Sequence, residues 1–232
     1  MILYRFQTIN KLTLQNLNNQ KNWVANPYEF NDPFEFSLHN ELFIDSYGDS
    51  RHLTENESIN IKKISEEINN YGVICYTSDY NNKLLWSHYG DHHKGMCLVF
   101  DISDEKANKI DKVTYQERLP EINLTEDANT FDEITKIVTT KSKEWKYENE
   151  YREVFIAKNM LYEYPGELTE IIFGCRAPYE DIKMVTDIAV SKNKEIKISK
   201  MIISKSEYNF VKMRIGDNTQ IPKLWKQPNF KI

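Results

Sequence analysis

The sequence predicts an α+β fold in a single domain that covers residues 1–232. Segments rich in β-branched and aromatic residues occur early, midway and late in the chain, and amphipathic helical patterns fall between them at irregular intervals. Glycine and proline number only seven each, and no low-complexity linker interrupts the chain. We therefore expect mixed or antiparallel sheets with inserted helices.

Eight segments have the composition of strands. In chain order they are residues 2–6, 22–26, 72–78, 96–102, 152–157, 170–174, 196–202 and 208–213.

Four segments have helical spacing of apolar residues. They are residues 9–19, 56–70, 129–144 and 179–191. The second is the clearest, and its pattern is expected to place Ile59, Ile61, Ile64 and Ile68 on one side. The stretch NKLLWSHYGDHH, before the strand at 96–102, has room for one or two helical turns and a tight return.

The bulk composition points to a cytoplasmic protein. None of the three cysteines has CxxC spacing, so we expect reduced thiols. The chain opens without a signal-peptide pattern. No apolar run approaches the ~20 residues of a membrane span, so we expect no membrane partner.

The net charge of −5 conceals a basic C-terminal segment, residues 192–232. This segment holds ten Lys and Arg against three Asp and Glu. It could face nucleic acid, or it could dock on the acidic remainder of its own domain.

The stretch LLWSHYGDHHKGMC contains three histidines, of which His88 and His92 are spaced i, i+4. That spacing occurs in zinc-binding helices. Gly90 and Asp91 lie between the two, however, and no nearby Cys or Glu completes a ligand set. We therefore predict no metal site.

Two other interpretations of the same stretch stay open. In both, Trp86 and Tyr89 pack inward and Lys94 and Gly95 form the turn before the next strand. The stretch is then either an aromatic packing corner or the wall of a ligand pocket.

FNDPFE, residues 30–35, predicts a rigid turn. Pro33 forces Asp32 into an extended backbone, and Asn or Asp before proline favours an Asx turn. The turn could be a structural staple. Equally, Asn31 and Asp32 could be polar groups held beside the apolar floor of a ligand site.

WKYENEYRE, residues 145–153, concentrates charged and aromatic residues before an apolar strand. If the motif runs into the strand that follows, Glu148, Glu150, Arg152 and Val154 share a face. If its early part is helical, Glu148 and Arg152 pair at i, i+4. A solvated ion-pair face is the plain interpretation, and a polar ligand at the mouth of the strand is the functional one. In LYRF, Arg5 lies inside the first strand, where an arginine is costly unless it is paired or used.

The order of these motifs resembles a bacterial family called domain of unknown function 2971, related to abortive-infection proteins of phage defence. The resemblance rests on LYRF, FNDPFE, CYTSDYNNKLLWSHYGDHHKGMCLVFD, WKYENEYRE and EIIFG. It implies a defence effector with an antitoxin or another defence protein as its partner.

The layout is also similar to ADP-ribosyltransferase-like folds. That similarity implies NAD as the substrate, with Glu150, Glu148 and Arg5 as catalytic residues. It departs from the pattern in having no first-strand histidine and no Ser-Thr-Ser motif. The residues expected to bind NAD are Tyr4, Asn31, Asp32, Trp86, His88, Tyr89 and Arg152.

The leading hypothesis is thus an NAD-consuming toxin, either a transferase or a glycohydrolase. A carboxylate would stabilise the cationic transition state, and Arg5 would hold the pyrophosphate. One alternative is a metal-dependent nuclease with oxygen ligands from Asp32, Glu35 and the two later glutamates. The other is a domain that binds a small ligand or a partner without catalysis.

A single site requires residues from distant motifs to meet. We predict that Asn31, Asp32, Trp86, Tyr89, Glu150 and Arg152 converge in space.

Overall fold

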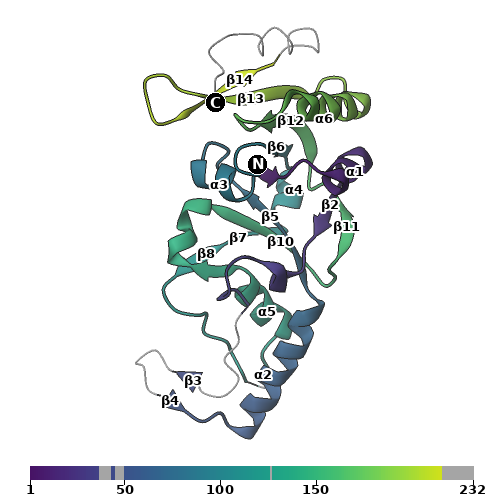
Figure 1. The fold of residues 1–232 in the computed structure, drawn as a ribbon. Coiled ribbons are helices and arrows are strands. Elements are labelled where there is room, and N and C mark those ends of the chain that lie inside the picture. Colours follow the sequence, from purple (N-terminus) through teal and green to yellow (C-terminus); the bar gives the residue numbers. More distant parts are fainter. Residues whose placement is uncertain (37–42, 45–49, 126, 216–232) are drawn as a thin grey trace. The chain divides into compact units, whose positions relative to one another are not determined.

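The computed structural model describes residues 1–36, 43–44, 50–125 and 127–215 (Figure 1). It confirms the α+β class. The described residues form two compact units, each built from separate stretches of sequence. Unit 1 comprises Met1–Asn22, Tyr76–Asn108 and Leu161–Ile232, and unit 2 comprises Trp23–Cys75 and Lys109–Met160. The chain therefore passes between the units four times, and no single linker separates them.

The sheet of unit 1 is mixed, as predicted. Its strands occur in the order β14-β13-β12-β6-β1, followed by the end of β5. Neighbouring strands are antiparallel except β12 and β13, which are parallel. In chain order these strands are β1 Ile2–Gln7, β5 Gly72–Thr77, β6 Met96–Asp101, β12 Glu167–Phe173, β13 Lys197–Ile203 and β14 Phe210–Arg214.

Unit 1 also contains the helices α1 Lys11–Asn19, α3 Lys83–His88, α4 Asp104–Ala107 and α6 Tyr179–Lys192. Helix α1 begins where the Asn10 side chain accepts the Thr13 backbone N–H at 3.0 Å, which satisfies a donor the helix leaves open. Helices α1 and α6 contact each other (Figure 1). Both were predicted from the sequence, within two residues at each end.

One part of the unit 1 core gathers around Trp86 on α3, whose side chain is fully buried. The indole N–H donates to the Tyr80 carbonyl oxygen at 2.8 Å, and the ring meets Phe6 edge to face at 4.9 Å. We call the buried set Trp86, Cys97, Val99, Ile172 and Met201 the Trp86 cluster. It is apolar throughout.

Unit 2 contains two longer helices, α2 Glu55–Glu67 and α5 Thr130–Val138, which contact each other (Figure 1). Helix α2 starts with a capping box: the Thr54 hydroxyl oxygen accepts the Glu57 backbone N–H, and the Glu57 carboxylate accepts the Thr54 N–H. Of the four isoleucines predicted to share a side, Ile61, Ile64 and Ile68 enter the core. Ile59 is exposed, because it precedes Ile61 by two residues and therefore lies about 200° around the helix from it.

The strands of unit 2 are short. Strand β10, Glu150–Phe155, lies between β5 and β7, Ile110–Lys112, and β8, Thr114–Gln116, runs parallel to β9, Thr140–Ser142. The remaining elements are the strand pairs β2 Lys21–Val24 with β11 Met160–Glu163 and β3 Phe43–Ile44 with β4 Ser50–Arg51, and the 3₁₀ turns Pro27–Glu29, Ile68–Asn70 and Lys143–Glu148.

The helix predicted for residues 129–144 is wrong at its C-terminal end. It stops at Val138, and the chain continues as β9 and then a 3₁₀ turn. Two β-branched residues, Thr139 and Thr140, follow the last helical residue and favour extended backbone. Strand β9 then directs Lys141 into the interior, where its charge is paired.

The basic C-terminal segment is described only as far as residue 215. Within that part, β13 and β14 belong to the sheet of unit 1, and the Lys212 ammonium lies 2.8 Å from the Glu170 carboxylate. This pair is of the kind expected if the segment docks on its own domain. The predicted segment's residues 216–232 lie outside the described residues.

Candidate functional site

The FNDPFE motif forms the predicted Asx turn in unit 2. Asp32 Oδ1 accepts the Phe34 backbone N–H at 2.9 Å, and the Glu35 N–H donates to the Asp32 carbonyl oxygen at 3.2 Å. Phe36 follows with a positive φ of 62°, which is rare for an aromatic residue. The turn leaves Phe34 exposed and buries Glu35 and Phe36.

Glu35 belongs to a buried set of five charged side chains, which we call the ion-pair network: Glu35, Lys141, Glu148, Glu150 and Arg152. Lys141 occupies its middle. The Lys141 Nζ lies 2.5 Å from Glu148 Oε2, 3.1 Å from Glu35 Oε1 and 3.3 Å from Glu150 Oε2. It also stands 4.7 Å from the centre of the Trp145 ring, within cation–π distance.

Arg152 joins the same carboxylates from β10. Its Nε and one terminal nitrogen donate to the two oxygens of Glu150 at 2.8 and 3.0 Å, a bidentate pair. That terminal nitrogen also donates to Glu35 at 2.5 Å, and the other donates to the Val138 carbonyl oxygen at 2.6 Å. Both Glu150 and Arg152 face the network, as strand alternation predicted.

The network holds Glu150 in its charged form. Burial by itself raises the pKa of Glu150, but the Arg152 guanidinium and the Lys141 ammonium outweigh it and bring that pKa down to about 2. Burial in turn lowers the pKa of Lys141, while the three glutamates more than compensate and raise it above its ordinary value. Arg152 is likewise held charged, since the pull of Glu150 and Glu35 on its pKa exceeds the effect of burial.

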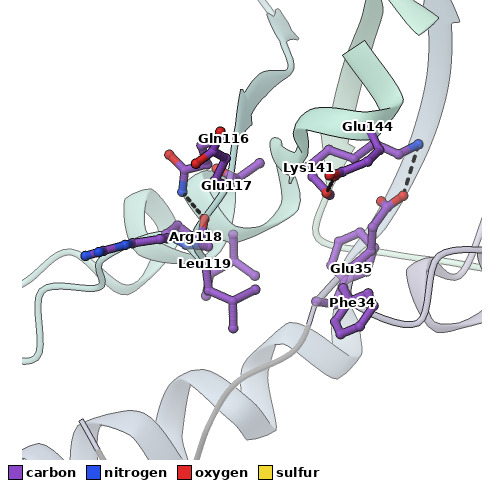
Figure 2. Close-up of a pocket in the computed structure, with 13 residues that line it drawn as sticks. Phe34, Glu35, Gln116, Glu117, Arg118, Leu119, Lys141 and Glu144 are labelled. Carbon is purple, nitrogen blue, oxygen red and sulfur yellow. Dashed lines mark hydrogen bonds and ion pairs between the residues drawn. The ribbon is translucent and has the colours of Figure 1, made fainter. Parts of the chain in front are cut away.

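A cavity of about 370 Å³ in unit 2 adjoins the ion-pair network. Phe34, Glu35, Lys141 and Glu144 lie on one side of it, and the segment Gln116 to Leu119 lies on the other (Figure 2). The remaining lining residues are Phe36, Pro120, Ile137, Thr140 and Ser142. Five of the thirteen lining residues are apolar or aromatic, and the other eight are polar or charged. The volume falls within the usual range of small-molecule sites, about 300–1,000 Å³.

Glu144 is the accessible carboxylate among the residues on the Lys141 side. It follows β9 and is exposed, whereas Glu35, which also lines the cavity, is buried. The Ser142 hydroxyl donates a short hydrogen bond to Glu144. This bond and a backbone hydrogen bond lower the pKa of Glu144, which keeps the carboxylate negative at neutral pH.

The predicted site residues divide between the two units. Asn31, Asp32, Glu148, Glu150 and Arg152 belong to unit 2. Within it the structure brings Glu148, Glu150 and Arg152 into one network, through Lys141. Asp32 is buried close by in the chain, before Glu35.

The other predicted residues, Tyr4, Arg5, Trp86, His88 and Tyr89, belong to unit 1. Tyr4 lies beside Tyr80, with ring centres 5.3 Å apart, and burial raises its pKa. Trp86 packs inward as predicted, while His88 is exposed at the end of α3. Convergence of these residues with those of unit 2 stays a prediction.

The histidine-rich corner is more constrained than a two-residue turn. The predicted turn at Lys94 and Gly95 is present before β6, but it is the end of a longer turn. That turn contains three successive residues with positive φ, Asp91, His92 and His93, at 48°, 51° and 71°. A side chain at Gly174 would approach the His93 carbonyl oxygen to 2.1 Å, so strand β12 must end in glycine there. Burial and the neighbouring Arg176 lower the pKa of His93.

Among residues 1–36, 43–44, 50–125 and 127–215, no three His, Cys, Asp or Glu side chains are grouped as a metal site requires. The three cysteines, all within these ranges, are free thiols. In the same part of the chain, no helix has the length and apolar character needed to cross a bilayer.

The comparison with protein families gives one match. The model of the family described as Protein of unknown function (DUF2971) matches residues 85–153. This match, which covers less than half of the chain, supports the predicted family. Searches of curated proteins and of solved structures each found no match. The matched stretch runs from α3 to β10 and contains Lys141, Glu144 and the WKYENEYRE motif, while LYRF and FNDPFE precede it.

Sequence reasoning missed three residues of this site. Lys141 and Ser142 were assigned to a helix, and Glu144 was read as its last residue. The signal that could have found them is the pair of threonines at 139 and 140, which ends the helix early. Glu35 was considered only as a metal ligand, whereas the structure pairs it with Lys141 and Arg152.

Proposed function

We propose that this protein is an NAD-cleaving effector of phage defence and that the cavity beside the ion-pair network is where the nicotinamide ribosyl half of NAD binds. The observation that carries the proposal is Glu144: an accessible, ionised carboxylate that lines a cavity together with aromatic and polar groups. The cavity volume of about 370 Å³ suits a ring and a ribose rather than a whole dinucleotide.

In the proposed reaction the bond between ribose C1′ and the nicotinamide nitrogen breaks, and its electron pair leaves with nicotinamide. Positive charge develops on the ribose, and the Glu144 carboxylate stabilises it. Water then adds to C1′ and loses a proton to solvent, giving ADP-ribose, nicotinamide and H⁺. An acceptor group on a target protein in place of water would give ADP-ribosylation.

The buried glutamates have a different part in this proposal from the one expected of them. Glu148 and Glu150 do not line the cavity; they hold Lys141 and Arg152. We assign them as positioning residues that fix β9 and thereby Ser142 and Glu144. Arg5, proposed for the pyrophosphate, belongs to unit 1 and stays a separate expectation.

The test is release of nicotinamide from NAD by the purified full chain, with and without EDTA. Glu144→Gln should lower the rate about a hundredfold or more. Its melting temperature should stay that of the wild type, because the side chain is exposed. Glu66→Gln is the matched control, since Glu66 is an exposed carboxylate on α2 of the same unit and should leave the rate unchanged.

EDTA should have no effect on this reaction. Nucleic acid cut only with Mg²⁺, with NAD untouched, would replace the proposal with the nuclease alternative. The defence role rests on the family resemblance, and we propose a cytoplasmic location and an antitoxin-like partner with it. Growth arrest on expression that disappears in Glu144→Gln would support it.

A second candidate is a domain that binds a small ligand without catalysis. The ion-pair network favours it, because Lys141 and Arg152 already contact all three glutamates. Saturable NAD binding by the wild type with no nicotinamide released would decide for this candidate.

A further inference from the structure

The buried charges of unit 2 do not balance. Among its described residues, the buried ionisable acids and bases are four carboxylates and two cations: Asp32, Glu35, Glu148 and Glu150 against Lys141 and Arg152. Burying a charge without a partner is costly, so an excess of negative charge in an interior calls for a further positive charge nearby.

The ion-pair network borders the cavity through one residue of each sign. Glu35 and Lys141 are both buried and both line it, so little water separates the network from a bound ligand. Glu35 Oε1 is shielded from solvent, and its partner is the Lys141 ammonium at 3.1 Å. In a medium of low effective dielectric constant, charges act over several ångströms and salt screens them weakly.

Phe34 provides a surface on which a flat ligand could stack. This side chain lines the cavity and is 69% exposed, so its ring is accessible to a ligand. An aromatic face of this kind attracts cations through its quadrupole. Phe34 and the network therefore favour the same class of ligand.

We infer that the cavity selects a flat, positively charged ring, and that it distinguishes a cationic pyridinium from its neutral counterpart of the same shape. The inference rests on the proposed function in naming the pyridinium of oxidised NAD as that ring. It implies that the protein reads the oxidation state of the nicotinamide, since the reduced ring carries no charge.

The experiment measures binding rather than turnover. Calorimetric titration with 1-methylnicotinamide, a cation, is compared with nicotinamide, its neutral relative. The cation should bind about tenfold tighter or more, and the ratio should persist at high salt because buried charges are poorly screened. Equal affinities, tighter binding of nicotinamide, or no binding of the cation would each overturn the inference.

Two variants separate the sources of the preference. Phe34→Leu keeps an apolar group but removes the ring, so it should weaken binding of the cation several-fold and leave nicotinamide nearly unaffected. Because the Phe34 side chain is exposed, this substitution should not impair folding. Glu35→Gln removes one buried negative charge and should reduce the cation preference. Should that variant fail to fold, the wild-type ratio and Phe34→Leu still decide.

This test can fail independently of the proposed function. A cation preference without nicotinamide release from NAD would keep the inference and reject the reaction. Nicotinamide release with no preference between the two probes would keep the reaction and reject the charge selectivity.

Discussion

The Trp86 cluster of unit 1 and the ion-pair network of unit 2 are both buried, but they are held together by different forces. Trp86 is surrounded by apolar residues and has its one polar atom satisfied by the Tyr80 carbonyl oxygen. Arg152 is equally buried, yet it contacts two carboxylates and a backbone carbonyl. The first depends on apolar burial, which is insensitive to pH, and the second depends on ionisation. The two units should therefore respond differently to the same change of pH.

The largest expected effect is that of Arg152→Met. The substitution leaves Glu35 and Glu150 buried with Lys141 as the remaining cation, and breaking such a network costs about 3–5 kcal/mol in the free energy of unfolding. Trp86→Ala should cost a similar amount, about 3–5 kcal/mol, through lost burial and a cavity. Urea denaturation of both variants at pH 7 measures these values.

The pH dependence separates the two variants. Without Arg152 the Glu150 carboxylate loses the strongest influence that lowers its pKa, so it becomes neutral at a higher pH. The deficit of Arg152→Met should therefore shrink between pH 7 and pH 4.5. The deficit of Trp86→Ala should not change. A constant deficit in both would show that the network contributes little through its charges.

Acid should have a smaller effect on the stability of the wild-type protein. The pKa of Glu150 is about 2 in the folded protein against an ordinary 4.5, so the folded state binds fewer protons there than the unfolded state. The stabilisation is present above about pH 4.5 and is lost as the pH falls toward 2. Hydrogen exchange should therefore accelerate in α5 and β10 of unit 2 before it accelerates in β6 and β12 of unit 1. The reverse order would contradict this account.

Much of the fold could be predicted from the sequence, because its elements have strong local patterns. The isoleucines of α2 and the apolar runs of β5 and β6 placed those elements correctly. Strand β9 was missed because its three residues, Thr140–Ser142, have no apolar pattern: its one inward residue is Lys141, which is buried through pairing. A local pattern of hydrophobicity cannot reveal an interior made of charges.

The candidate site was also predictable in part, because some of its residues have strong local patterns. The pattern of Asp32 before Pro33 predicted the turn, and alternation along β10 placed Glu150 and Arg152 on one face. The contacts of Glu35 with Lys141 and Arg152 join residues more than a hundred positions apart in the chain, and no spacing rule relates them. Glu144 gave no sequence signal, since it lay at the end of a predicted helix.

The most direct test of NAD binding in the cavity is a hydrogen-exchange footprint of NAD on the Glu144→Gln variant, in which turnover should be blocked. Binding of NAD should slow exchange at residues 116–119 and 140–144, which lie at the cavity, and should leave the strands of the Trp86 cluster unchanged. Protection confined to the stretch from Trp86 to Gly95 in unit 1, or no protection at saturating NAD, would contradict it.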